Sequence, residues 1–227
     1  ANAALSTAQS SVDAVLKAGY ALLPTFADIF NLNNEANSEL IWTLPYIVNE
    51  NVTPGTSPNF FAYYLAPNGD RTRLREAGYT EDEVPAGSHA QYVVPTQAYC
   101  DFLAEDARDT RTDVSVRVFE DKFLTEEVQI KRMVVKFKGS FANDTRSFDS
   151  DVPVYRLAEA YLLKAEVENA LGNTDAALQN LNVVAKRAYG VDNYYTARTQ
   201  DAIDNAIISE ILKEFVAESK AWWAYLR

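Results

Sequence analysis

The chain has 227 residues, which suffices for one or two domains with a substantial hydrophobic core. Hydrophobic residues make up 48% and charged residues 23% of it, as in ordinary folded proteins, so disorder throughout is excluded. The formal net charge of −11 repels phosphate backbones and anionic lipid surfaces. A nucleic-acid-binding function is therefore disfavoured, and the 13 Tyr and 11 Phe, several of them in loop-like segments, become the notable feature.

The scarcity of cysteine and histidine excludes several kinds of site. Cys100 is the only cysteine and His89 the only histidine, so an intramolecular disulfide, a cysteine-based metal site and a His-pair zinc site are ruled out. We expect no metal and no cofactor. No apolar run approaches the ~20 residues that cross a bilayer, and the first residues lack a signal-peptide pattern.

The beginning of the chain predicts a helix, a helical turn and a strand. Apolar residues recur at helical spacing from about Ser6 to Leu16, with Ser6 or Thr7 as N-cap and Gly19 as the stop. LLPTFADIF predicts a helical turn. ELIWTLPYIV, rich in β-branched and aromatic residues, predicts a strand in which Pro45 marks an edge or a bulge.

The next segment lacks a regular pattern. Between Asn49 and Gln91, Pro, Gly, Asn and Ser interrupt the chain without sustained periodicity. About forty residues without a firm element are unusual in a compact domain and often form a functional surface. We therefore expect residues 49–95 to carry the ligand-binding surface.

A helix and two strands follow. PTQAYCDFLAED predicts a helix capped by Thr96. Period-two alternation predicts strands in DVSVRVFE, through Val114, Val116 and Val118, and in EVQIKRMVVKFK, through Val128, Ile130 and then Val135 and Phe137.

The last third is strongly helical. VYRLAEAYLLKAEVENALG and NTDAALQNLNVVAKRAYG carry apolar stripes, with Gly172 ending the first helix and Thr174 as N-cap of the second. This pair resembles a tetratricopeptide-type hairpin, which needs stacking neighbours. A final helix is predicted from about Thr199 to Leu226. Its terminal rings are expected in the core: Trp222, Trp223 and Tyr225.

The predicted fold class is mainly α, with helix pairs of the tetratricopeptide type, long loops and a few short strands. We divide the whole chain, 1–227, into consecutive regions: 1–48 with the entry helices and strand, 49–95 with the candidate ligand surface, 96–150 with a helix and a strand pair, and 151–227 with the C-terminal helices.

The carboxylates show no catalytic constellation. An acid–base hydrolase needs two carboxylates at about 5–10 Å with divergent pKa values, and nothing in the sequence selects such a pair. Solvated or capping roles are expected for Asp101, Glu105, Asp106 and Asp109, which cluster at a helix end, and for Asp149 and Asp151, which flank a turn. ANDTRSFDSD superficially suggests calcium but lacks the ladder, central Gly and distal Glu of a calcium loop. We therefore predict that the protein is not an enzyme.

Four segments in order resemble the SusD/RagB family of Bacteroidetes outer-membrane nutrient-binding lipoproteins. GYALLPTFADIFNLNNEANSELIW and PTQAYCDFLAEDARDTR are similar to two of its upstream segments. The family helix R-x-A-E-x-x-L-x-x-A-E and its closing E-x-x-x-E-F-x-x-E-G-x-R-W-x-D-L-x-R are matched at Arg156, Ala158, Glu159, Leu162, Ala165, Glu166, Glu210, Glu214, Phe215, Glu218, Trp222, Leu226 and Arg227. The chain departs from the closing pattern at Ser219 for Gly, Ala221 for Arg and Tyr225 for an acidic residue.

The motif residues themselves are expected to be structural. Physical reasoning pairs Glu159, Glu166, Glu214 and Glu218 with Arg156, Lys164 or Arg227. The resemblance implies a non-enzymatic protein at the cell surface, lipid-anchored to the outer membrane through an N-terminal region absent from this chain. It also implies an oligosaccharide or other small nutrient as ligand and a SusC-type TonB-dependent transporter as partner. On this reading the chain is the C-terminal portion of a longer protein.

Sugar capture needs several exposed rings. Stacking half of one aromatic side chain contributes roughly 2–3 kcal/mol, less than the ~4 kcal/mol of a millimolar site. The candidate ligand residues combine aromatic rings with polar partners: Tyr46, Asn59, Phe60, Tyr63, Tyr64, Asn68, Asp70, Arg71, Tyr79 and Tyr92. The segment FFAYY could instead be a short buried strand. The alternative functions are a helical-repeat scaffold that binds proteins and, least favoured, a carbohydrate-active enzyme.

Overall fold

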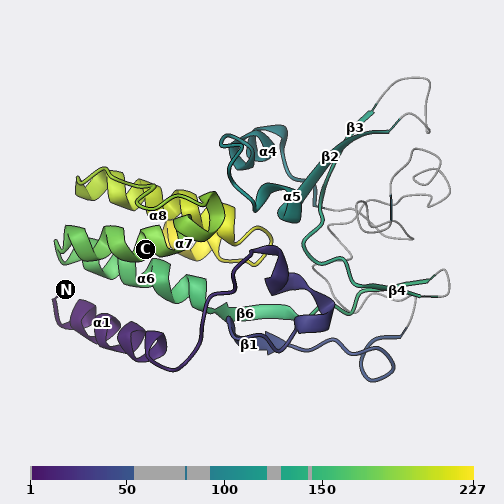
Figure 1. The fold of residues 1–227 in the computed structure, drawn as a ribbon, viewed down its shortest axis with the longest axis horizontal. Helices are drawn as coiled ribbons and strands as arrows, with labels where there is room; N and C mark the ends of the chain where they lie inside the picture. Colours follow the sequence, from purple (N-terminus) through teal and green to yellow (C-terminus); the bar gives the residue numbers. More distant parts are fainter. Residues whose placement is uncertain (1, 54–79, 81–92, 122–128, 143–144) are drawn as a thin grey trace.

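The computed structural model describes residues 2–53, 80, 93–121, 129–142 and 145–227. A helical layer occupies one side of the molecule, and the short strands with two further helices occupy the other (Figure 1). The helical layer consists of α1 (Asn2–Leu16), α6 (Leu157–Ala170), α7 (Thr174–Tyr189), α8 (Gln200–Glu214) and α9 (Ala221–Leu226). The connecting and strand-side helices are η1 (Ala27–Phe30), η2 (Leu32–Asn34), α4 (Gln97–Leu103) and α5 (Thr112–Ser115).

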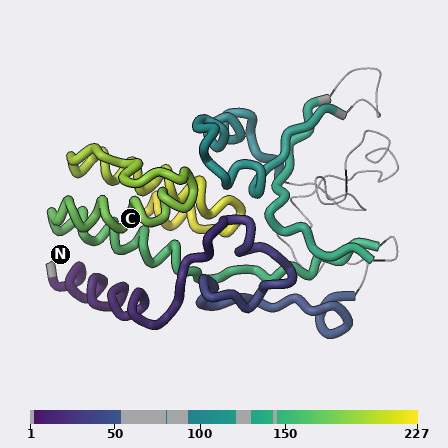
Figure 2. Tube along the Cα trace, in the orientation of Figure 1, coloured from purple at the N-terminus to yellow at the C-terminus, as the bar shows by residue number. Residues whose placement is uncertain are grey.

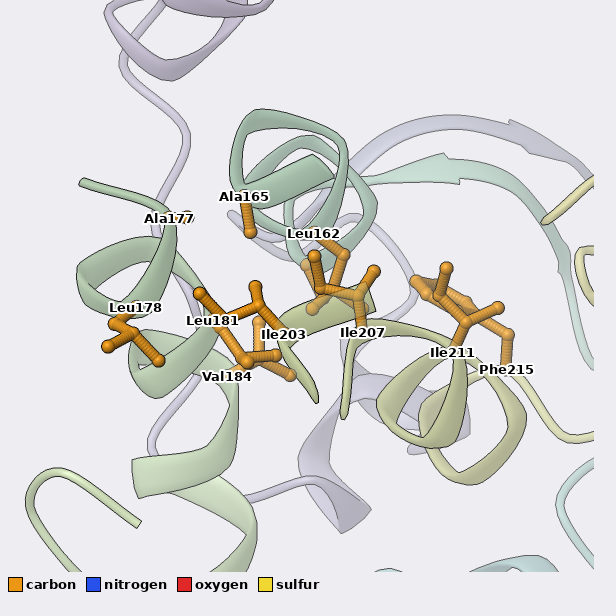
Figure 3. Close-up of a cluster of buried hydrophobic side chains, with 11 residues drawn as sticks. Leu162, Ala165, Ala177, Leu178, Leu181, Val184, Ile203, Ile207, Ile211 and Phe215 are labelled. Carbon is orange, nitrogen blue, oxygen red and sulfur yellow. The ribbon is translucent and has the colours of Figure 1, made fainter. Parts of the chain in front are cut away.

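The apolar core lies between α6, α7 and α8. Each of these helices presents a stripe at 3.6-residue spacing, and small alanines such as Ala158, Ala165 and Ala177 let the helices approach closely. Figure 3 shows Leu162, Ile203 and their neighbours pointing toward one another. The predicted stripes on α6 and α7 are confirmed. In Figure 2, α1 lies along α6, at the edge of the layer.

Local capping signals fix most helix ends. Gly172 and Gly190 end α6 and α7 with positive φ values of 80° and 68°, a conformation that glycine adopts without strain. Thr96 caps α4 by accepting a hydrogen bond from Tyr99 N, as predicted. The N-caps predicted for α1 and α7 are wrong, because α1 begins at Asn2 and Asn173 precedes α7.

The strands form three separate antiparallel pairs. They are β1 (Leu40–Leu44) with β6 (Val152–Arg156), β2 (Val116–Asp121) with β3 (Gln129–Val134), and β4 (Ser140–Ala142) with β5 (Thr145–Ser147). β1 ends at Leu44, so the predicted strand is too long: Pro45 lies beyond it, and the irregular register falls between Leu40 and Thr43 instead. The β1–β6 pair joins residues more than a hundred positions apart and runs directly into α6.

The alternation predicted for β2 and β3 is wrong in part. Val114 belongs to α5, Val128 lies outside the described residues, and Val118 and Ile130 are exposed. Val116 and Phe119 are buried, and so are Val135 and Phe137, which lie beyond the end of β3. Val116 packs with Cys100 and Leu103 of α4. Because a two-stranded ribbon twists strongly as it leaves the helix that covers it, its buried face changes along its length.

The predicted final helix is interrupted. α8 ends at Glu214 and α9 starts at Ala221, because Ala217 and Ser219 between them have φ values of 60° and 61°. The turn directs the rings of α9 outward, so Trp222 is 66% exposed and Trp223 is 61% exposed. Their predicted place in the core is therefore wrong. None of the helices in the described ranges is long and apolar enough to cross a membrane.

Candidate functional site

Most of the predicted ligand residues cannot be placed. Outside the described residues lie Asn59, Phe60, Tyr63, Tyr64, Asn68, Asp70, Arg71, Tyr79 and Tyr92. Tyr46 is described, and it sits half-buried just beyond β1, at the start of the predicted ligand surface.

A tight turn follows Tyr46. Asn51 holds it by accepting a hydrogen bond from Ile47 N at 2.7 Å and donating one to Pro45 O at 2.8 Å. Asn49 adopts a φ of 68°, which Asn tolerates better than most residues. Asp151 anchors the same segment, since its Oδ1 accepts from Tyr46 N at 2.9 Å.

Three carboxylates gather beneath this turn, and we call Glu35, Asp149 and Asp151 the acidic root. Glu35 Oε1 accepts from Asp151 N at 2.9 Å, and Asp149 accepts from the backbone N–H and the hydroxyl of Ser140 at 2.6 and 2.7 Å. Burial raises the pKa of Glu35 to about 7, with repulsion from Asp151 and Asp149 acting in the same direction. The root therefore contains a carboxyl group that titrates near neutral pH.

An aromatic platform lies on the outer face of the β1–β6 pair. Trp42 and Tyr155 are 55% and 50% exposed, their ring centroids are 6.0 Å apart and their planes are inclined by 34°. Lys220 Nζ lies 4.5 Å from the Tyr155 centroid and is itself fixed by Val154 O at 2.6 Å and Glu159 at 2.8 Å. Two inclined rings are thus held on regular strands, open to solvent.

The sequence predicts a strand at Trp42 but does not predict the platform. Period-two alternation in ELIWTLPYIV puts Trp42 and Leu44 on one face, and both are exposed. This alternation is the signal in the sequence from which the exposure of Trp42 could be predicted. The contribution of Tyr155 could be found only from the pairing of β1 with β6.

A second group of charged residues is fully enclosed. We call it the buried ion cluster: Glu39, Asp109, Arg111, Lys136, Arg156, Arg187, Glu210, Glu214 and Glu218. Arg156 lies at its centre, bonded to Glu214 Oε1 at 2.6 Å, Glu218 Oε2 at 2.8 Å and Glu39 Oε1 at 3.1 Å. Its guanidinium carbon lies 4.3 Å from the Phe215 ring centroid. Arg187 bonds the same Glu39 and Glu214.

The cluster extends on both sides of Arg156. Arg111 bonds Asp109 and Glu210, each at 2.7 Å, and also donates to Tyr189 Oη. On the other side Lys136 bonds Glu218 at 2.5 Å, and burial lowers the pKa of Lys136 to about 8 against the attraction of Glu218.

The positive φ values at Ala217 and Ser219 flank Glu218, whose carboxylate lies inside the buried ion cluster. A backbone in this conformation is strained for side chains other than Gly, Asn and Asp. The local strain and the cluster thus occur at the same place, and the ion pairs of Glu218 hold the turn in position.

The buried ion cluster joins elements rather than offering a reactive group. Its carboxylates all receive hydrogen bonds from cationic side chains, so it supports the fold. The predicted pairs of Arg156 with Glu214 and Glu218, and of Arg227 with Glu166, are confirmed. Of the solvated or capping role predicted for Asp109, the solvated alternative is wrong, because Asp109 is buried against Arg111; its Oδ1 does accept a hydrogen bond from Arg111 N, just before α5. Within the described ranges, no group of three His, Cys, Asp or Glu could hold a metal ion.

Among the described residues, the helical layer carries two cavities large enough for a small molecule. One of about 310 Å³ lies between α6, α8 and α9, with Glu166, Asp204, Ile207 and Tyr225 in its lining. The other, of about 430 Å³, lies between α7 and the segment before α8. Neither involves a residue predicted to bind ligand.

Comparison with known proteins points to one family. Residues 120–227 match the model of the SusD family. The curated SusD-like protein P25 of Formosa agariphila is 28% identical over 91% of this chain and 43% of its own length. The chain thus spans about half the length of its relatives.

Solved structures share the fold over nearly the whole chain. A SusD superfamily protein of Bacteroides fragilis is 26% identical with a TM-score of 0.78, covering 98% of this chain and 47% of its own. NanU of B. fragilis is 24% identical with a TM-score of 0.76, covering 98% and 50%. Surface glycan-binding protein A of Bacteroides uniformis is 23% identical with a TM-score of 0.66, covering 96% and 44%. The latter two show the fold alone. The family model matches the C-terminal part of the chain, and the curated relative and the shared fold extend the similarity, so the chain is similar to SusD-family proteins over nearly its whole length.

Proposed function

We propose that this protein binds a neutral oligosaccharide or a similar nutrient by ring stacking and polar contacts, without catalysis. The observation that carries the proposal is the exposed Trp42–Tyr155 platform, whose inclined rings match the apolar C–H faces of consecutive pyranose units. The strand that bears Trp42 leads directly to Tyr46 and to the predicted ligand surface, residues 49–95.

The platform is large enough to contribute usefully. Covering one face of an aromatic side chain of 150–250 Å² contributes roughly 2–3 kcal/mol at ~25 cal/mol/Å². Two rings reach about the 4 kcal/mol of a millimolar site before immobilisation costs are subtracted. Contacts from Tyr46 and its neighbours would then raise the affinity further.

The family supports this class of ligand. Surface glycan-binding protein A of B. uniformis shares the fold and is named for glycan binding. The enclosed carboxylates of the buried ion cluster are bonded to cationic side chains, and those of the acidic root are bonded to backbone N–H groups: Glu35 to Asp151 N, Asp151 to Tyr46 N and Asp149 to Ser140 N. Binding without chemistry is therefore the function that the geometry favours.

The test compares two exposed tryptophans. Trp42→Ala and Tyr155→Ala should each reduce retention on a polysaccharide affinity gel at least tenfold. Trp222→Ala, which removes an equally exposed ring from α9, should leave retention unchanged. If no polysaccharide in a broad panel is retained, or if Trp222→Ala reduces retention as strongly as Trp42→Ala, the proposal is wrong.

We further propose that the bound nutrient is delivered to a SusC-type TonB-dependent transporter by a lipid-anchored, cell-surface form of the protein. The proposed transporter and lipid anchor rest on the similarity to the SusD family. Association with a co-expressed SusC-type transporter, measured by co-purification from outer membranes, would test it. Transporter association that is lost on deletion of the family's lipid-attachment cysteine from a full-length relative would support the anchor.

One observation favours the alternative, a scaffold that binds proteins. The rings of Trp222, Trp223 and Tyr225 are all exposed on α9, and exposed apolar patches often mark protein contacts. Loss of the transporter in Trp222→Ala/Trp223→Ala, with glycan retention absent in the unmodified protein, would favour the scaffold.

A further inference from the structure

The cavity of about 430 Å³ has a wall that is fastened along α7. Residues 192–198, which we call the strap, run antiparallel to the helix and are joined to it at three points. Lys186 pairs with Asp192 at 2.7 Å, and Arg198 pairs with Asp175. Between them Asn182 donates to Tyr195 O at 2.9 Å and accepts from Tyr195 N at 2.8 Å.

We call the cavity between the strap and α7 the strap groove. The three contacts between strap and helix define its shape. From Asp175 to Lys186 the helix rises about 16 Å at 1.5 Å per residue. The side-chain amide of Asn182 is buried, and both its N–H and its oxygen are already bonded to the backbone of Tyr195. Asn182 therefore holds the strap in place and is not a ligand contact. The volume falls within the range of small-molecule sites, about 300–1,000 Å³.

The other polar side chains of the groove are available for hydrogen bonds to a ligand. Gln179, Asn193 and Thr196 line the cavity, and none of them has a side-chain partner among the described residues. An amide both donates and accepts, and so does a hydroxyl. Leu178 and Val183 add apolar surface to the same lining. This mixture matches a ligand whose hydroxyl groups alternate with C–H faces.

The charges of the groove indicate a neutral ligand. Its two basic side chains are each paired with an acid, so the lining has no net charge. An anionic ligand would compete with Asp175 and Asp192, and a cationic ligand with Lys186 and Arg198. In either case the ligand would only replace one ion pair by another.

We propose that the strap groove is a second binding site, for a neutral polyhydroxylated ligand such as a short glycan segment. It shares no residue with the Trp42–Tyr155 platform. The inference extends the proposed glycan binding to a second place on the protein, and it rests on that function only for the choice of probe.

The test is a titration with maltose, cellobiose and lactose, followed by two-dimensional NMR of the ¹⁵N-labelled chain. Saturable shifts are expected in the backbone amides of the strap and the side-chain amide of Gln179. Gln179→Ala combined with Asn193→Gly should weaken this binding at least tenfold. Glycine at 193 keeps the positive φ of 53° without strain, so the fold is retained. Asn180→Ala, on the same helix but outside the lining, and Trp42→Ala should leave the binding unchanged.

The outcomes separate this site from the platform. Shifts confined to β1 and β6 would overturn the strap groove while supporting the proposed function. Absence of shifts in the strap at any sugar concentration also overturns the groove, whereas the proposed function is judged independently by the affinity gel. Glucuronate or glucosamine binding as tightly as the neutral disaccharides would contradict the neutral-ligand assignment.

Discussion

The buried ion cluster and the acidic root both withdraw carboxylates from water, but only the cluster surrounds them with cations. Burial by itself would raise the pKa of Glu214, yet attraction to Arg187, Arg156 and Arg111 lowers it well below its usual range. At the acidic root, burial raises the pKa of Glu35 to about 7, and its charged neighbours are acids. The same side-chain type is therefore permanently charged in one region and titratable in the other.

The difference suits the positions of the two regions. The buried ion cluster connects α7, α8, β6 and the segments around Glu39, Arg111 and Lys136, so its charges fix how the helical layer meets the strands. The acidic root lies where β1 leaves the fold and enters the predicted ligand surface. The buried ion cluster thus keeps its charges, whereas the charge of the acidic root can change near neutral pH.

The largest expected effect comes from breaking the cluster at Arg156. Arg156→Met removes the cation that Glu214, Glu218 and Glu39 share and leaves the enclosed carboxylates with only Arg187, Lys136 and Arg111 as cationic partners. We expect this imbalance of buried charge to cost about 3–5 kcal/mol of unfolding free energy. Urea denaturation monitored by circular dichroism measures the loss.

Arg227→Met is the matched control for this change. Arg227 pairs with Glu166 at 2.8 Å, but the pair is partly exposed, so its loss should cost about 1 kcal/mol or less. Equal losses in the two variants would contradict the structural role given to the buried ion cluster.

The contrast between the cluster and the helical core also explains which features were predictable. The stripes of α6 and α7 follow from local spacing, so they could be read from the sequence alone. The cluster draws on residues 39 to 218, and only the Arg156 pairs were anticipated. Spacing carries no information on which distant charges meet, so the bonds of Arg111 to Glu210 and Glu214 have no signal in the sequence.

The errors at α9 and the platform have specific causes. Helical periodicity continues through Ala217 and Ser219 without a Gly or Pro, so the left-handed turn that exposes Trp222 has no local signal. Ser219 stands where the family pattern has Gly, which fits its positive φ. The platform depends on the pairing of Trp42 with Tyr155 across β1 and β6, a contact that residue spacing does not reveal.

The second-largest effect is expected from acid, which should lower the stability that the buried ion cluster contributes. The pKa values of Glu214 and Glu218 are lowered in the folded protein, so the unfolded chain takes up protons first as the pH falls. Their contribution to stability is present above about pH 4.5, the usual value, and is lost as the pH drops through the folded pKa values. Urea denaturation from pH 6 to 3 should show this decline, and Glu218→Gln should be less stable at pH 6 but show a shallower decline. An unchanged slope in that variant would show that Glu218 does not take part in the acid response.

The smallest expected effect, with the opposite sign, belongs to the acidic root. Because the folded pKa of Glu35 is raised to about 7, the folded protein binds a proton between pH 4.5 and 7 that the unfolded chain has released. This contribution to stability is therefore present below about pH 4.5 and is lost as the pH rises to 7. Glu35→Gln keeps an oxygen for Asp151 N and removes the titration, so the variant should gain stability relative to the unmodified protein as the pH rises through this window. Thermal unfolding at half-unit pH steps measures the difference. If the two proteins keep a constant separation from pH 4.5 to 7, Glu35 is not the titrating group, and the contrast between the acidic root and the buried ion cluster does not hold.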